Sequence, residues 1–112
     1  MADYNAGELS QRVTLRRYTE VQNEYGTLVR TAVDLATVWA LVRPMSGRER
    51  DHAQQTQSRA NYLVVIRSAV AKNHALDEKD YVVWRGEEMN IRFVKYRPRS
   101  RYVELECERG AD

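Results

Sequence analysis

The sequence predicts a mainly β protein, a small antiparallel β-barrel or sandwich of about six strands. Three observations support this fold class: runs of β-branched and aromatic residues recur along the chain, turn residues separate them, and no βαβ pattern is present. A chain of 112 residues can bury one modest core. We therefore predict a single domain over residues 1–112, with a short mobile N-terminal arm and an extended polar loop at 46–61 between the second and third strands.

The first two strands are predicted on either side of a turn-rich segment. Alternation of polar and apolar residues in the first strand places Val13 and Leu15 on its buried face. Residues 19–32 contain turn residues and predict a loop or a ragged hairpin. The second strand is expected to begin near Leu35 and to end at Pro44, because proline has no amide hydrogen to donate to a β-ladder.

The second half of the chain predicts a central strand followed by a hairpin. Residues 62–66 are apolar at nearly every position, as in a strand covered on both faces. Residues 68–80 are mostly polar and predict a loop. Gly86 separates the strand-like segments 81–84 and 89–94 and allows the backbone to reverse between them, which predicts a β-hairpin.

The last predicted strand, residues 102–108, shows the clearest alternation in the sequence. Val103, Leu105 and Cys107 are expected to point into the core, and the glutamates between them to point into solvent. Charge on that face discourages unwanted strand pairing. The glutamates are Glu104, Glu106 and Glu108. The side chains predicted to be largely buried are Trp39, Val64, Ile66, Trp84, Ile91, Phe93, Val103 and Leu105.

The segment from Ser46 to Asn61 contains almost nothing that a core could use. Ser46 and Glu49 have the spacing of a capping box, and good helix formers follow, so the loop is expected to contain some helix. A helix without an apolar stripe has no face to bury. We therefore expect this segment to be loosely held on the isolated domain and to become ordered against a partner.

Composition excludes several classes of protein. No long apolar run is present that could span a membrane, and the N-terminus lacks the basic start and apolar centre of a signal peptide, so we expect the protein to stay in the cytoplasm in which it is made. A single cysteine, Cys107, rules out an internal disulfide. A formal net charge of +2 is too small for a general nucleic-acid binder. Any basic function must therefore be local.

Candidate catalytic chemistry is sparse. His52 and His74 are far apart in the sequence and lack the spacing of metal ligands, so we expect no metal site. Cys107 lies on an inward strand face, where a buried cysteine behaves as a small hydrophobic residue. The sequence has no glycine-rich loop for phosphate and no nucleophile–base pair. We expect no cofactor and no enzymatic activity.

Two clusters of basic residues remain. One surrounds the entrance of the polar loop and contains Arg43, Arg48 and Arg50, and the other follows the fifth strand and contains Arg97, Arg99 and Arg101. In a lone monomer a solubilising surface is the favoured interpretation, because aromatic residues do not alternate with these arginines. In a ring of many copies, a few arginines from each subunit add up to a positive collar.

Several short motifs occur one after another along the chain. The most specific is W-A-x-V-x-P-x-S-G-R-E at residues 39–49. It is preceded by G-E-L at 7–9 and R-V-T-L at 12–15, and V-E-L-E-C-E follows at 103–108. Together these motifs resemble the head-tail joining family of tailed bacteriophages, also called head closure or stopper proteins. Related gene transfer agents use similar proteins.

The resemblance implies a non-enzymatic structural connector. Such a protein is expected to form a hexameric or dodecameric ring in the neck of the particle, below the portal and adaptor and above the tail terminator or tail proteins. It closes the channel through which double-stranded DNA leaves, and assembly takes place in the bacterial cytoplasm. The resemblance makes the polar loop the channel or interface element, with residues Arg43, Ser46, Gly47, Arg48, Glu49, Arg50 and Arg59, and leaves Arg97, Arg99 and Arg101 as candidate DNA or partner contacts.

The alternative function belongs to a different class of protein. A free small β-barrel can bind single-stranded nucleic acid by combining basic residues with aromatic stacking platforms. In this chain, the arginines near Arg97 and the rings of Tyr96 and Tyr102 are the residues for that role.

Overall fold

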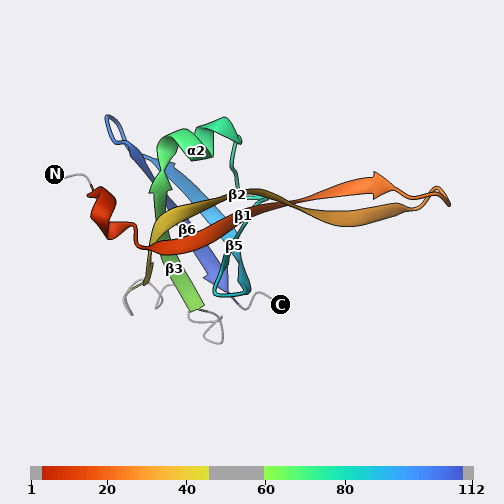
Figure 1. Ribbon diagram of the computed structural model, residues 1–112, viewed down its shortest axis with the longest axis horizontal. Helices are drawn as coiled ribbons and strands as arrows, with labels where there is room; N and C mark the ends of the chain where they lie inside the picture. The colour runs from red at the N-terminus through yellow and green to blue at the C-terminus, as the bar shows by residue number, and fades with distance from the viewer. Residues whose placement is uncertain (1–3, 46–59, 110–112) are drawn as a thin grey trace.

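The protein is a closed, six-stranded antiparallel barrel from which one long hairpin projects (Figure 1). The computed structural model describes residues 4–45 and 60–109. The strands close in the order β1-β2-β3-β6-β5-β4. They are β1 (Gln11–Gln22), β2 (Leu28–Pro44), β3 (Ala60–Arg67), β4 (Tyr81–Trp84), β5 (Glu87–Tyr96) and β6 (Tyr102–Arg109). The predicted fold class is confirmed.

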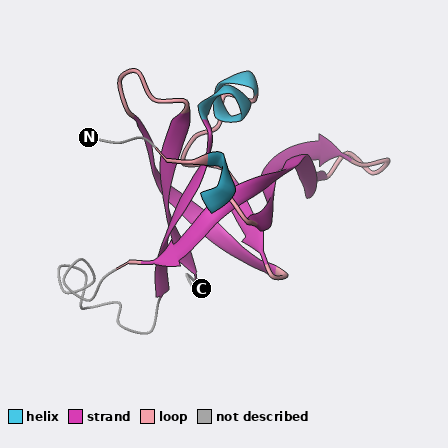
Figure 2. Ribbon diagram, turned by 60° about the vertical axis from the view of Figure 1, so that its left-hand side comes forward, coloured by secondary structure: helices cyan, strands magenta, loops and turns pink. Residues whose placement is uncertain are grey.

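Two short helical segments accompany the barrel. The 3₁₀ helix η1 (Ala6–Glu8) precedes β1, and the helix α2 (Ser68–Asn73) follows β3 at one end of the barrel (Figures 1 and 2). Residues 68–80 were expected to form a loop, and α2 corrects that expectation. Its Ala71 is fully buried in the core, and Leu76 just beyond it is only 5% exposed. No described helix is long and apolar enough to cross a membrane.

The core fills the barrel interior. Burial of one large aliphatic side chain stabilises the fold by about 1.5–3 kcal/mol relative to leaving that side chain exposed. The predicted core residues Val64, Ile66, Ile91, Val103 and Leu105 are all buried. Other members of the cluster are Val13, Leu15, Ala40, Val82, Met89 and Cys107. Burial raises the pKa of the Cys107 thiol, which fits the expected core role of this side chain.

The N-terminal segment covers part of the outer surface of the barrel. Leu9 packs with Val65 and Tyr102 in a second apolar cluster, and Tyr4 lies against it. The Tyr4 and Tyr102 rings meet edge to face with centroids 6.0 Å apart. Burial, followed by the hydrogen bond that its hydroxyl donates to Glu104, raises the pKa of Tyr4.

Three of the predicted core and surface positions are wrong. Trp39 is 53% exposed and Phe93 is 58% exposed, whereas Glu108, which was expected in solvent, is buried. Trp84 is partly buried and packs against the core. A register shift in β5 between Ile91 and Phe93 explains the second error, because it turns Phe93 to the outer face opposite Glu106. The glutamates of β6 do lie on the outer face, but Glu108 is buried there beside Arg92, with 3.7 Å between Nε and Oε1.

Candidate functional site

The most prominent feature outside the barrel is a two-stranded ribbon, which we call the arm and define as residues 17–33 (Figure 1). Pairing of β1 with β4 ends at Arg16, and pairing of β2 with β3 begins at Leu41. Beyond the barrel the two strands pair with each other as far as Gln22 and Leu28. At about 3.3 Å per residue, the arm reaches about 27 Å from the barrel. Of the two alternatives predicted for residues 19–32, the hairpin is confirmed and the loop is not, and β2 starts at Leu28 instead of near Leu35.

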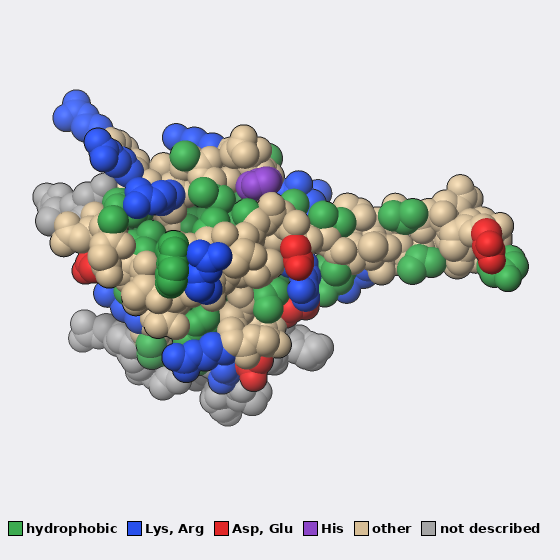
Figure 3. Space-filling view, viewed as in Figure 1, with side chains coloured by type: hydrophobic (Ala, Val, Ile, Leu, Met, Phe, Trp, Pro, Cys, Tyr) green, Lys and Arg blue, Asp and Glu red, His purple; other side chains and the backbone are tan. Residues whose placement is uncertain are grey.

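One face of the arm is apolar and uncharged beyond its base, where Arg17 lies on it. Cross-strand partners in an antiparallel pair point to the same face. The register therefore places Val21 beside Val29, Thr19 beside Thr31 and, at the base of the arm, Val33 beside Arg17. The three valines are 53%, 43% and 42% exposed. This face continues the side of β1 that is buried inside the barrel. Figure 3 shows hydrophobic side chains along the projecting ribbon.

The opposite face of the arm is polar and is tied to the barrel at its base. Arg16 pairs with Asp34 through Nε and Oδ1, 2.8 Å apart, and with Glu88 of β5 through Nη1 and Oε2, 3.0 Å apart. The Tyr18 hydroxyl also donates to Glu88. Burial alone raises the pKa of Glu88, but the hydrogen bonds from Tyr18 and Arg16 outweigh it and hold that pKa below its usual value.

Arg30 adds a stacked contact to the same face. Its guanidinium carbon lies 3.7 Å from the centroid of the Tyr18 ring, and Nη2 donates to the Tyr81 hydroxyl over 3.1 Å. The two tyrosine rings meet edge to face, with centroids 5.2 Å apart. Because Tyr81 belongs to β4, these contacts fix one side of the arm against the barrel.

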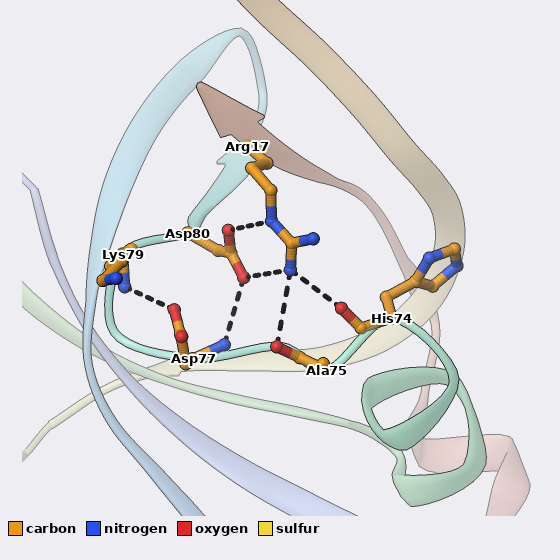
Figure 4. A network of polar contacts seen from close by, with 6 residues as sticks. All are labelled: Arg17, His74, Ala75, Asp77, Lys79 and Asp80. Carbon is orange, nitrogen blue, oxygen red and sulfur yellow. Dashed lines mark hydrogen bonds and ion pairs between the residues drawn. The ribbon is translucent and has the colours of Figure 1, made fainter. Parts of the chain in front are cut away.

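A buried ion pair fixes the other side of the base (Figure 4). Arg17 donates from Nε and Nη2 to the two carboxylate oxygens of Asp80, at 2.8 and 2.9 Å, and from Nη2 to the His74 carbonyl at 2.8 Å. Asp80 is 1% exposed and also accepts the Asp77 amide. The hydrogen bonds with Asp80 raise the pKa of Arg17. The direction in which the arm leaves the barrel is thus set by contacts on both of its faces.

The tip of the arm is an ordered turn with an aromatic side chain in solvent. The Asn23 side chain accepts the amides of Tyr25 and Thr27, each over 2.9 Å. Gly26 adopts a φ of +82°, which only glycine takes without strain. Tyr25 is 83% exposed. The arm therefore presents a rigid, partly apolar surface, which is typical of a protein–protein contact and not of a catalytic site.

The described residues contain neither a candidate metal centre nor an unpartnered buried side-chain polar group. Within residues 4–45 and 60–109, no three His, Cys, Asp or Glu side chains are grouped so that they could hold a metal ion. Over the same ranges, every buried side-chain nitrogen and oxygen has a hydrogen-bond partner.

A family model of phage head completion proteins matches residues 4–110. The chain belongs to this family. No curated protein matches the chain. Among solved structures, a Shigella flexneri 2a protein determined in solution is 20% identical, with a TM-score of 0.75, and the match covers 97% of this chain and 99% of the other. A chain from the virion of a native gene transfer agent particle is 18% identical, with a TM-score of 0.65, over 90% and 94% of the two chains. At these identities, the two structures show a shared fold.

The site residues predicted for this head completion protein are only partly described. Arg43 is exposed near the end of β2 and lines a hollow with Pro44, Met45 and Leu63. The other predicted loop residues lie outside the described residues, so their role stays a prediction. These residues are Ser46, Gly47, Arg48, Glu49, Arg50 and Arg59.

The second basic cluster lies at the turn between β5 and β6. Arg99 and Arg101 are exposed there, whereas Arg97 pairs with Glu104 through Nη1 and Oε2, 3.2 Å apart. Tyr96 is 43% exposed, but Tyr102 is only 6% exposed beneath the N-terminal segment. Tyr102 therefore cannot serve as the stacking platform that the single-stranded nucleic-acid hypothesis requires.

The sequence allowed a ragged hairpin at residues 19–32 but did not indicate that it projects from the barrel as a long arm. The signal for its two strands was present, because β-branched residues alternate with polar ones on both sides of the Asn23–Thr27 turn. The turn residues between the two strands obscure this alternation in the sequence. In addition, the Arg17 and Asp80 partners are far apart in the sequence, and only the fold brings them together.

Proposed function

We propose that this head completion protein is a connector subunit that forms a hexameric or dodecameric ring below the portal and adaptor of a tailed phage or gene transfer agent. The ring closes the channel through which double-stranded DNA exits and provides the platform for the tail terminator or tail proteins. Its role is structural and not enzymatic, and it acts in the neck of the particle after assembly in the host cytoplasm.

Membership of the phage head completion family carries this proposal. The geometry supports it in two ways. A closed barrel is a rigid unit without free strand edges along its wall, which suits the wall of a ring. The arm extends the molecule to 54 Å along its longest axis, against 34 and 24 Å along the others, so one subunit can reach across another of the same size.

The polar loop is the proposed channel or interface element. It contains Arg48, Arg50 and Arg59 together with Glu49 and Asp51, and it follows β2, near whose end Arg43 is exposed. Repeated around a ring, a few arginines per subunit create a strong positive potential at the channel surface, where the DNA phosphates are close. Arginines in a polar loop are expected to contribute little to folding, so we propose that these act in the assembly.

Charge reversal in assembled particles tests the function. We expect Arg48→Glu combined with Arg50→Glu to leave the isolated domain folded, with an unchanged melting temperature. Particles carrying this double variant should leak packaged DNA or fail to acquire tails, because each subunit changes its charge by four units and the field at the channel reverses. DNA retention is measured by nuclease sensitivity, and tail attachment by electron microscopy.

The matched control is the double lysine variant, Arg48→Lys with Arg50→Lys, which keeps the charge. It should retain DNA and tails. Normal DNA retention and tailed particles in the double glutamate variant would contradict a channel or interface role for the loop. Absence of the wild-type protein from the neck would contradict the connector function itself.

A further inference from the structure

A small hollow lies on the barrel between the β1–β2 strands and α2. It is lined by Arg12, Thr37, Val38, Trp39, Arg67 and Val70 and has a volume of about 250 Å³. Trp39, at 53% exposure, is the large aromatic side chain at this surface. The guanidinium carbon of Arg12 lies 4.8 Å from the centroid of the Trp39 ring. A volume of this size is below that of the usual small-molecule pocket and suits a protruding side chain or a turn.

The hollow carries positive charge without a compensating carboxylate. Arg12 stacks on Trp39, and the guanidinium carbon of Arg67 lies 5.7 Å from the Tyr102 ring centroid. Neither arginine forms an ion pair with any residue that the structure describes. An acidic group that enters the hollow therefore meets two available guanidinium groups, which form the stronger class of hydrogen bond with carboxylates.

The tip of the arm has the complementary chemistry. Glu24 carries the one formal charge in the turn at residues 23–27, and Tyr25 beside it is 83% exposed. The Asn23 side chain orders this turn in advance, so little conformational freedom is lost when it docks. Tyrosine, tryptophan and arginine are the residues that most often dominate the binding energy of a protein interface.

We propose that the arm of one subunit docks on the next copy of this chain in the ring, with Tyr25 against Trp39 and Glu24 between Arg12 and Arg67. This inference rests on the ring of the proposed function and identifies its subunit contact. Because tip and hollow are different surfaces of one chain, the contact is head-to-tail, and repetition of it closes into a ring when the rotation is suitable. The reach of about 27 Å is comparable with the two shorter extents of the molecule, 34 and 24 Å.

The exposed apolar face of the arm also indicates that another protein surface covers this face in the assembly. Val21, Val29 and Val33 are each more than 40% exposed on a ribbon whose strands have free edges. Such a ribbon is prone to unspecific association unless an assembly covers it. Docking of the tip across a neighbouring barrel places this face against the neighbour and removes it from water.

Disulfide cross-linking in assembled particles tests the contact. The chain has one native cysteine, Cys107, which is buried, so engineered cysteines dominate the reaction. We expect Tyr25→Cys combined with Arg67→Cys to give, on mild oxidation, a ladder of covalent oligomers on non-reducing denaturing gels. The matched control pairs Tyr25→Cys with Arg85→Cys, a site that is exposed on the β4–β5 turn and does not line the hollow. The control pair should give no ladder.

Each of the following results would overturn the inference. Particles that contain the Tyr25→Cys and Arg67→Cys chain and retain DNA, yet give no ladder, would leave the connector function intact and remove this contact. Dimers from Tyr25→Cys alone would show that arms pair with each other. Cross-links from the tip to a different virion protein would assign the arm to that protein. If the wild-type chain is absent from the neck, both the connector function and this contact fail.

A charge swap provides a second, independent measurement. We expect Glu24→Arg and Arg67→Glu each to lower the yield of tailed particles about tenfold or more, because each places like charges together. The variant with both changes restores opposite charges and should recover most of the yield. Glu24→Gln, which removes the charge without reversing it, should have a smaller effect than Glu24→Arg. No recovery in the double variant, with all three proteins folded, would contradict the pairing.

Discussion

The Arg17 guanidinium and the buried Asp80 carboxylate meet through two hydrogen bonds, 2.8 and 2.9 Å long, at the point where the arm leaves the barrel. Asp80 precedes β4 and lies at 1% exposure, whereas the Arg17 side chain is 34% exposed. A carboxylate in such a position requires its partner, because an unpaired buried charge is costly. The pair therefore connects the structure of the α2–β4 loop to the orientation of the arm.

Arg17→Met is expected to destabilise the fold by about 2–4 kcal/mol, because it leaves Asp80 buried without its cation. Urea unfolding followed by circular dichroism measures the change. The matched control is Lys79→Ala in the same loop, where an exposed cation is removed and the effect should stay within about 0.5 kcal/mol. Equal effects of the two substitutions would show that the Arg17 ion pair adds nothing to stability.

Glu88→Gln tests the pH dependence of the contact between the arm and β5. Since the folded pKa of Glu88 lies below its ordinary value of 4.5, its ionised form stabilises the fold above that pH, and this contribution is lost as the pH falls through the folded pKa. The wild type should therefore be more stable than the Gln variant near neutral pH. We expect the difference to shrink steadily as the pH is lowered below about 4.5.

The control for this measurement is Glu24→Gln at the exposed tip of the arm. Its unfolding free energy should follow that of the wild type at every pH. A stability difference between wild type and Glu88→Gln that stays constant down to strongly acidic pH would contradict a role for Glu88 ionisation at the base of the arm.

Alternation of apolar and polar residues predicted side-chain burial correctly in regular strands but not where a strand has a register shift. It correctly predicted the barrel, the inward side of Val103, Leu105 and Cys107, and the hairpin at Gly86, because these depend on local pattern and turn chemistry. Phe93 was misplaced because the register shift in β5 depends on pairing with β6, which cannot be read from β5 alone.

The candidate site was harder to predict than the fold. An arm looks like any strand pair in sequence, because alternation reports an apolar face and not what covers it. Trp39 illustrates the same limit: its size favoured a core position, yet it stands on the outer face of β2 beside Arg12. The contacts that fix the arm to the barrel join residues far apart in the sequence, such as Arg17 with Asp80 and Arg30 with Tyr81.

Leu105→Ala and Phe93→Ala compare a position where the alternation predicted burial correctly with one where it did not. Leu105 is fully buried, so its truncation should cost roughly 2–5 kcal/mol through lost burial and the cavity left behind. Phe93 is 58% exposed and should cost far less, within about 1 kcal/mol. Thermal or urea unfolding of both variants measures the difference. A Phe93 variant as unstable as the Leu105 variant would mean that Phe93 is covered in the folded protein.

Gly86→Ala tests the turn between β4 and β5. Arg85 and Gly86 have φ values of +54° and +80°, the two positive values of a type I′ hairpin turn. An added methyl group meets no atom within 4 Å at Gly86, so the expected loss of about 1 kcal/mol or somewhat more comes from the left-handed backbone alone. The matched control is Gly7→Ala, where space is equally open and φ is not positive, and which should be neutral or slightly stabilising. Equal unfolding midpoints for the two variants would mean that the turn does not require the left-handed conformation at residue 86.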